Sequence, residues 1–202
     1  MSRRFLISNH VERVMRGFIK YVIFISSLSV GVLSAEESKE PSTDIERFQA
    51  TTGDVIIKGM EEIGTTIRGK YKGKLTVEAR EFIKVSAGDK SFGIVVEVKE
   101  TSGSYPKTGR SFVDYDELDS LVDGIDYISN IDETASSLSS IEATYSTNGG
   151  VEVSAFTSRG KLAYAITAGT YPSLNIYLNS AMDLTTFKDS VIAAKVRIDS
   201  IK

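Results

Sequence analysis

Four basic side chains alternate around a tyrosine in one short stretch of the sequence, in which Arg68, Lys70, Lys72 and Lys74 surround Tyr71. In an extended segment, alternate positions lie on one side of the backbone. Such a row would present four cations to anionic lipid headgroups, an acidic glycan or a nucleic-acid backbone. The alternative is a hairpin tip with ordinary solubilising lysines, which the shortness of the stretch and the acidity of the chain favour.

Two tyrosines, Tyr105 and Tyr171, each precede a proline in similar loops. A residue before proline is restricted to extended geometry. At matching places in two similar modules, these rings would flank one shared groove as aromatic platforms. The interpretation we prefer is that each ring lies at a strand end and packs against its own helix.

An acidic segment separates Arg110 from Arg159, with no basic residue between them. Its most regular part consists of Asp116, Asp119, Asp123 and Asp126, whose spacing places them on one helix face. Calcium favours clustered carboxylate oxygens. No EF-hand-type loop is present, however, and carboxylates on one helix seldom converge on an ion. We therefore expect a solvated face, with no metal and no cofactor.

Histidine and cysteine are both absent from residues 36–202. This excludes from that part of the chain a Ser-His-Asp or Cys-His nucleophile and a zinc site with histidine ligands. No glycine-rich phosphate loop occurs at a strand-to-helix junction. Two carboxylates can still form a hydrolase site, but no spacing selects a pair. We expect a protein without catalytic activity and rank a two-carboxylate hydrolase third among the possible functions.

The N-terminal region has the layout of a secretory signal peptide. Five basic residues in positions 1–21 precede an apolar and small-residue run, Val22 to Ala35, and cleavage after Ala35 is expected. The run is shorter than the roughly 20 residues of a comfortable membrane span. The alternative is an uncleaved anchor that extends back to Phe18, and Met15 offers a second possible start. These features predict export to the periplasm or the cell exterior.

Residues 36–202 hold 19 basic and 26 acidic side chains, a net charge of −7. An acidic balance argues against nucleic acid as a general partner. Without cysteine, stability has to come from packing alone. We expect the partner to be a protein or another envelope component, with membrane contact only through an uncleaved signal segment.

Residues 36–51 are polar and contain Pro41, which predicts a disordered leader before one domain over residues 52–202. Hydrophobic alternation predicts strands within that domain, and residues 55–67 are assigned to a strand although their isoleucine spacing also fits a helix. The expected strands are 55–67, 75–85, 91–99, 111–113, 141–147, 151–157, 162–168 and 175–178. Amphipathic helices are expected over 114–131 and 183–201.

An internal repeat relates the two halves, because the stretch TSGSYP at 101–106 recurs as TAGTYP at 167–172. The same offset of 66 residues carries Leu118 onto Leu184 and predicts that residues 70–133 match 136–199. The fold class is therefore α+β, with two tandem modules of three to four antiparallel strands plus one helix. One curved sheet with both helices on one face would bury the apolar stripes most simply.

Four stretches resemble a family of uncharacterised exported bacterial proteins: Glu62–Thr65, Val77–Phe82, Phe112–Leu121 and Gly124–Ile128. The resemblance covers most of residues 36–202 and implies no known activity or functional residues. Separately, the layout is similar to that of PUR-repeat and whirly proteins, which bind single-stranded nucleic acid. That likeness concerns layout alone, which does not determine function.

The sequence thus predicts an exported, non-catalytic binding or envelope-associated structural protein. The alternative is a tandem-module binder of single-stranded nucleic acid or another anionic polymer, which would act through residues 68–74.

Overall fold

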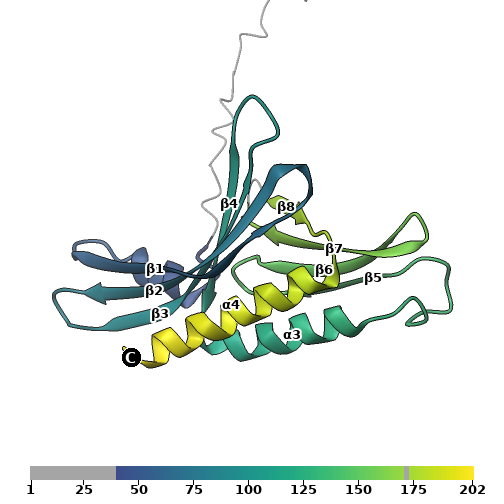
Figure 1. Ribbon diagram of the computed structural model, residues 1–202. Coiled ribbons are helices and arrows are strands. Elements are labelled where there is room, and N and C mark those ends of the chain that lie inside the picture. The colour runs from purple at the N-terminus through teal and green to yellow at the C-terminus, as the bar shows by residue number, and fades with distance from the viewer. Residues whose placement is uncertain (1–39, 171–172) are drawn as a thin grey trace, which may run out of the picture. The chain divides into compact units, whose positions relative to one another are not determined.

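The computed structural model describes residues 40–170 and 173–202, which form two four-stranded antiparallel sheets and three α-helices (Figure 1). Both sheets follow chain order, β1-β2-β3-β4 and β5-β6-β7-β8. In chain order, the elements are α2 (Asp44–Gln49), β1 (Ile56–Arg68), the 3-10 turn η1 (Lys70–Lys72), β2 (Gly73–Lys84), β3 (Lys90–Glu100), β4 (Lys107–Asp114), the 3-10 turn η2 (Tyr115–Glu117), α3 (Leu118–Asn130), β5 (Glu142–Ser146), β6 (Glu152–Ser158), β7 (Lys161–Ala168), β8 (Leu174–Tyr177) and α4 (Ala181–Asp199).

The α+β class and the two tandem modules are confirmed, and the ambiguous segment at 55–67 is a strand. The strands nevertheless form two hydrogen-bonded sheets and not the single curved sheet expected. Strand β4 pairs with β3 and β5 pairs with β6, so α3 and the loop after it link two separate sheets, each of which is covered by the helix of the other module.

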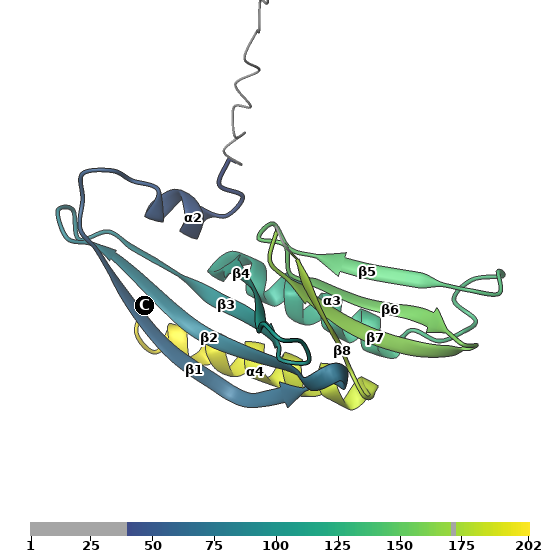
Figure 2. The same cartoon turned by 90° about the horizontal axis from the view of Figure 1, so that it is seen from above.

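Each helix packs mainly on the sheet of the other module. Helix α3, which ends the first module, contacts β5 and β6, whereas α4 contacts β1, β2 and β3. The two helices lie side by side (Figures 1 and 2) and run antiparallel. Ion pairs link them at two places, with Lys188 2.6 Å from Asp126 and Lys195 3.7 Å from Asp119. Neither module can therefore bury its sheet without the other.

The 66-residue offset holds through both helices. All five buried positions of α3 match buried positions of α4 at this offset: Leu118, Leu121, Gly124, Ile125 and Ile128 correspond to Leu184, Phe187, Ser190, Val191 and Ala194. Earlier in each module the offset fails, because β1, β2 and β3 are longer than β5, β6 and β7. The gapless match of 70–133 onto 136–199 is thus limited to the last part of each module.

Small residues let each helix approach the sheet that it covers. The glycine is on the helix in one contact and on the strand in the other. A Cβ on Gly124 of α3 would lie 2.4 Å from the Tyr145 ring of β5. At the equivalent place on α4 stands Ser190, and there the glycine is on the strand: a Cβ on Gly64 would lie 2.4 Å from the Ser190 hydroxyl. Gly64 has a φ of +75° at a register shift in β1, a conformation that glycine adopts without strain.

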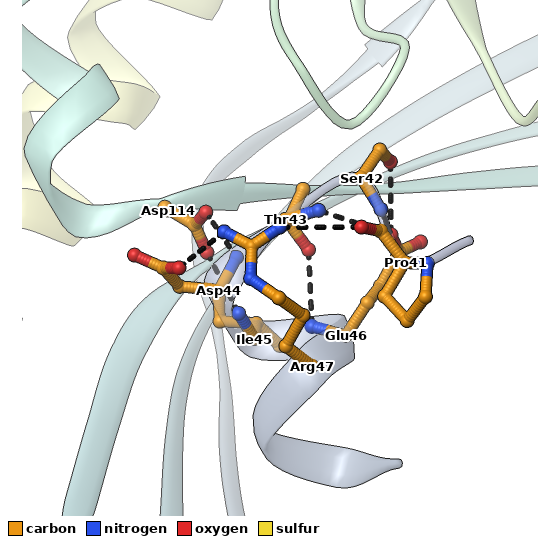
Figure 3. A network of polar contacts seen from close by, with 8 residues as sticks. All are labelled: Pro41, Ser42, Thr43, Asp44, Ile45, Glu46, Arg47 and Asp114. Carbon is orange, nitrogen blue, oxygen red and sulfur yellow. Dashed lines mark hydrogen bonds and ion pairs between the residues drawn. The ribbon is translucent and has the colours of Figure 1, made fainter.

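The expectation of a disordered leader over 36–51 is wrong for residues 44–49, which form α2. Thr43 and Glu46 form a capping box at its start, and Asp114 accepts hydrogen bonds from the backbone N–H of Asp44 (2.6 Å) and Ile45 (3.0 Å) (Figure 3). The Ile45 side chain is fully buried, and α2 contacts β2, β3 and β4. This helix covers an apolar part of the first sheet, which explains why a polar segment is ordered.

We expect Phe187→Ala to lower the free energy of unfolding by about 3 to 5 kcal/mol, because the ring is fully buried where α4 meets the core. Asp119→Asn is the matched control: its side chain is 80 % exposed and 3.7 Å from Lys195, so the loss should stay at or below about 0.5 kcal/mol. Urea melts of both variants measure the difference. Equal losses would show that α4 does not hold the core.

Candidate functional site

The turn between β1 and β2 has an unusual backbone. Tyr71 has φ 54° and ψ 34°, and Lys72 has φ 58°. Two consecutive positive φ values are typical of a type I′ hairpin turn, which favours Asn-Gly. A non-glycine residue in this conformation costs on the order of 1 to 3 kcal/mol. Selection for the stability of the turn alone would therefore not favour tyrosine and lysine at these two positions.

The same turn passes closely over the edge strand β8. A Cβ on Gly69 would lie 2.4 Å from Cγ1 of Ile176 and 2.6 Å from the backbone oxygen of Tyr177, so only glycine fits there. The Asn179 side-chain amide donates a hydrogen bond of 2.8 Å to the Arg68 backbone oxygen. These contacts fix the tip of the first sheet against the second module.

An aromatic row, defined as Tyr71, Tyr177 and Phe156, crosses this junction. The centroids of the Tyr71 and Tyr177 rings are 6.2 Å apart at 86°, and those of Tyr177 and Phe156 are 6.3 Å apart at 77°. Both are edge-to-face contacts, the geometry that aromatic pairs favour. The row joins the turn to the face of the second sheet that lies away from the core.

Beside Tyr177 and Phe156, that face is hollowed into an open depression of about 550 Å³. Ser154 and Ala165 lie between the larger side chains, and Ser154 and Thr157 bring hydroxyl groups to its lining. Asn175 and Glu142 complete its polar groups. The depression therefore combines aromatic faces with hydrogen-bonding side chains.

A basic row, defined as Arg68, Lys74 and Lys99, crosses the end of the first sheet. Register places Arg68 directly opposite Lys74, and Lys74 directly opposite Lys99. Like charges directly opposite each other destabilise a sheet. The row continues into η1, where Lys70 and Lys72 are exposed. Two neighbouring positions thus carry costs in folding stability, the strained turn and the like-charge pairs.

Glu97 is the carboxylate that offsets part of this positive charge. Its side chain is almost fully buried, and its two oxygens form ion pairs with Lys99 and Arg110. Burial alone would raise the pKa of Glu97, but the bonds and charges of the two cations outweigh burial and lower the pKa below the ordinary glutamate value. The pair Lys99 and Arg110 is thereby held in place at the edge of the basic row.

The predicted site residues have different outcomes. The hairpin tip at 68–74 is present, but the four cations do not alternate along one extended strand, because Tyr71 and Lys72 have positive φ. Arg68 and Lys74 lie on the strands, whereas Lys70 and Lys72 lie in the turn. Tyr105 is 84 % exposed in the β3–β4 loop, so the preferred interpretation that its ring packs against a helix is wrong. Tyr171 lies outside the described residues, as do residues 1–35.

Sequence reasoning missed Lys99, Tyr177 and Phe156. Each comes from a different strand. Pairing of β2 with β3 brings Lys99 opposite Lys74, whereas packing of the turn against β8 brings Tyr177 beside Tyr71, and Phe156 contacts Tyr177 within the second sheet. The one signal in the sequence was the poor match of Tyr71 and Lys72 to a tight turn between two glycines, which indicates that these side chains have another role.

The acidic face of α3 is partly paired with α4, through Asp119 and Asp126. Within residues 40–170 and 173–202, no three or more His, Cys, Asp or Glu side chains are grouped so as to hold a metal ion. In the same residues, none of the helices has the length and apolar character needed to cross a membrane.

The chain matches no protein-family model, no curated protein and no solved structure. The functional interpretation therefore rests on the geometry of the site.

Acid should weaken the fold through Glu97. A lowered pKa in the folded state means that its contribution is present above the unfolded value of about 4.3 and is lost as the pH falls through the folded value. Glu97→Gln should lower the free energy of unfolding by about 1 to 2 kcal/mol at pH 7 and flatten its decline below pH 4.3. Glu100→Gln, at a half-buried neighbour on the same strand, is the control. Denaturant melts from pH 3 to 7 give the free energy of unfolding as a function of pH. The same dependence on pH in both variants would contradict this role of Glu97.

The strained turn offers a second prediction. Replacing Tyr71 by Asn and Lys72 by Gly gives the residues that a type I′ turn favours, so the double variant should be about 1 kcal/mol more stable than the wild type. The loss of the Tyr71–Tyr177 contact offsets only part of this gain, because Tyr71 is mostly exposed. Thermal melts measure the change, and a clear loss of stability would show that the turn is not strained.

Proposed function

We propose that this protein is an exported, non-catalytic binding protein whose ligand is an anionic polymer held by the basic row and by Lys70 and Lys72. The observation that carries the proposal is the directly opposed cations Arg68, Lys74 and Lys99. A sheet gains nothing from such pairs by itself. A polyanion that lies across the row would relieve the repulsion and turn an unfavourable arrangement into a favourable one.

The position of the positive charge supports a local site. Residues 36–202 have a net charge of −7, yet the end of the first sheet gathers five cations in the basic row and the turn. General repulsion from an acidic protein weakens non-specific binding of polyanions, whereas a local cluster still attracts them at short range. Binding should therefore be confined to this surface and should weaken with salt.

The export part of the proposal is supported by the basic and apolar segments of residues 1–35, which lie outside the described residues. Outside the cytoplasm, the basic row and the turn could bind acidic envelope polysaccharides or other polyanions. An acidic protein with one confined basic surface is suited to such a partner.

Binding of fluorescent dextran sulfate to the full chain tests the proposal, with Arg68→Gln and Lys74→Gln combined in one variant. Affinity should fall about 10-fold and the salt dependence should become shallower, since two cation contacts are removed. Stability should not fall, because the substitutions also remove a like-charge pair.

The matched control removes the same charge at another hairpin, by Arg159→Gln and Lys161→Gln, where both side chains are exposed. Its affinity should stay within twofold of the wild type. Equal weakening in the two double variants would show that binding follows net charge and not this surface, and the proposal would fail. Absence of binding by the wild type at low salt would also refute it.

A further inference from the structure

The aromatic row lies next to the proposed polyanion surface, and no part of that function requires it. We propose that the depression beside Tyr177 and Phe156 binds a sugar ring, and that the polymer is an acidic polysaccharide whose carboxylates lie toward the basic turn. This inference deepens the proposed function and rests on it.

The aromatic faces are held ready for a ligand. Tyr177 is 39 % exposed and lies between Tyr71 and Phe156, each in an edge-to-face contact with it. A ring fixed on both sides loses little conformational freedom on binding. The C–H face of a pyranose is apolar and packs on such a ring, while its edge carries hydroxyl groups.

The floor of the depression is kept low by small side chains. Register places Ser154, Ala165 and Tyr177 in one row across β6 to β8, so two small residues of the lining stand beside one large ring. The resulting depression of about 550 Å³ lies within the usual range of ligand sites, roughly 300 to 1,000 Å³. One or two sugar rings therefore have room above these strands.

The polar groups offer both donors and acceptors. Thr167 donates a hydrogen bond of 2.9 Å to the side-chain oxygen of Asn175, which leaves the Asn175 amide N–H groups to donate to a ligand. Glu142, opposite Phe156 in the register, supplies acceptor oxygens. The Ser154 hydroxyl donates to the backbone oxygen of Ala165 and keeps its acceptor capacity, and the Thr157 hydroxyl accepts from the backbone N–H of Ile141 and keeps its donor. Sugar hydroxyls both donate and accept, so this mixture fits them.

The distribution of charge favours a sugar over a nucleotide chain. The five cations of the basic row and the turn lie next to β8, whereas Glu142 and Glu152 lie on β5 and β6 across the depression, and the exposed Lys161 stands at the start of β7. A uronic acid has its carboxylate at one edge and neutral hydroxyls at the other, which matches this one-sided pattern. A nucleic acid carries a phosphate with every base, so some of its phosphates would lie close to the two glutamates and be repelled by them.

Titration of the full chain with oligogalacturonate and with polyphosphate tests the inference. Tyr177→Ala should weaken oligogalacturonate binding at least 10-fold and leave polyphosphate binding within twofold. Asn175→Asp should also weaken oligogalacturonate binding, since it replaces a donor by a charge that repels a uronate. Tyr127→Ala is the control, because this exposed tyrosine lies on α3. The variant with Arg68→Gln and Lys74→Gln should lose affinity for both polymers.

The outcomes separate the two proposals. If the Arg68 and Lys74 variant loses affinity for both polymers but Tyr177→Ala and Asn175→Asp bind oligogalacturonate like the wild type, the sugar site is wrong and the proposed function stands. If the wild type binds neither polymer, both fail. If oligo-dT binds more tightly than oligogalacturonate and depends on Tyr177, the surface is a nucleic-acid site and this inference is overturned. A neutral galactan should bind at least 10-fold more weakly than oligogalacturonate, and equal binding would remove the role of the cations.

Discussion

Burial of each helix against the sheet of the other module is the constraint on which the structure depends. Helix α3 ends the first module but covers β5 and β6, and α4 ends the second but covers β1 to β3. A sheet of four strands with one apolar face is not stable until that face is covered. The exchange therefore makes one cooperative unit of two modules, although each has the same order of strands and helix.

The site follows from this exchange. The two modules have to meet along more than their helices, and the tip of the first sheet is pressed onto β8, where Gly69 leaves room for Ile176. The contact carries Tyr71 to Tyr177 and brings a basic turn beside the open face of the second sheet. A surface composed of both modules arises at a junction that the core already holds rigid, and a rigid junction is a suitable place for ligand recognition.

The sequence was sufficient to predict the elements whose pattern is contained in a short segment of the chain. Alternation located the strands, and the 66-residue offset correctly aligned the helices, because a buried stripe repeats along one helix regardless of what covers it. Which sheet each helix covers could not be predicted from this pattern, since both sheets have an apolar face. The same limit applies to Lys99 and Phe156, whose neighbours depend on strand register. The order of α2, by contrast, was visible in its capping box, Thr43 and Glu46, and was missed because the polar composition around it was given more weight.

The position of α4 along the chain has a consequence for biosynthesis. This helix is translated after all eight strands, yet it covers the first sheet that leaves the ribosome. Until α4 emerges, Val77, Ile94 and Val96 of that sheet lack their cover, so a partly made chain presents an apolar, strand-rich surface to its surroundings. A core that is completed only by the last helix stays incompletely folded during translation. An incompletely folded chain is the form that a narrow export channel can pass, which agrees with the export proposed above.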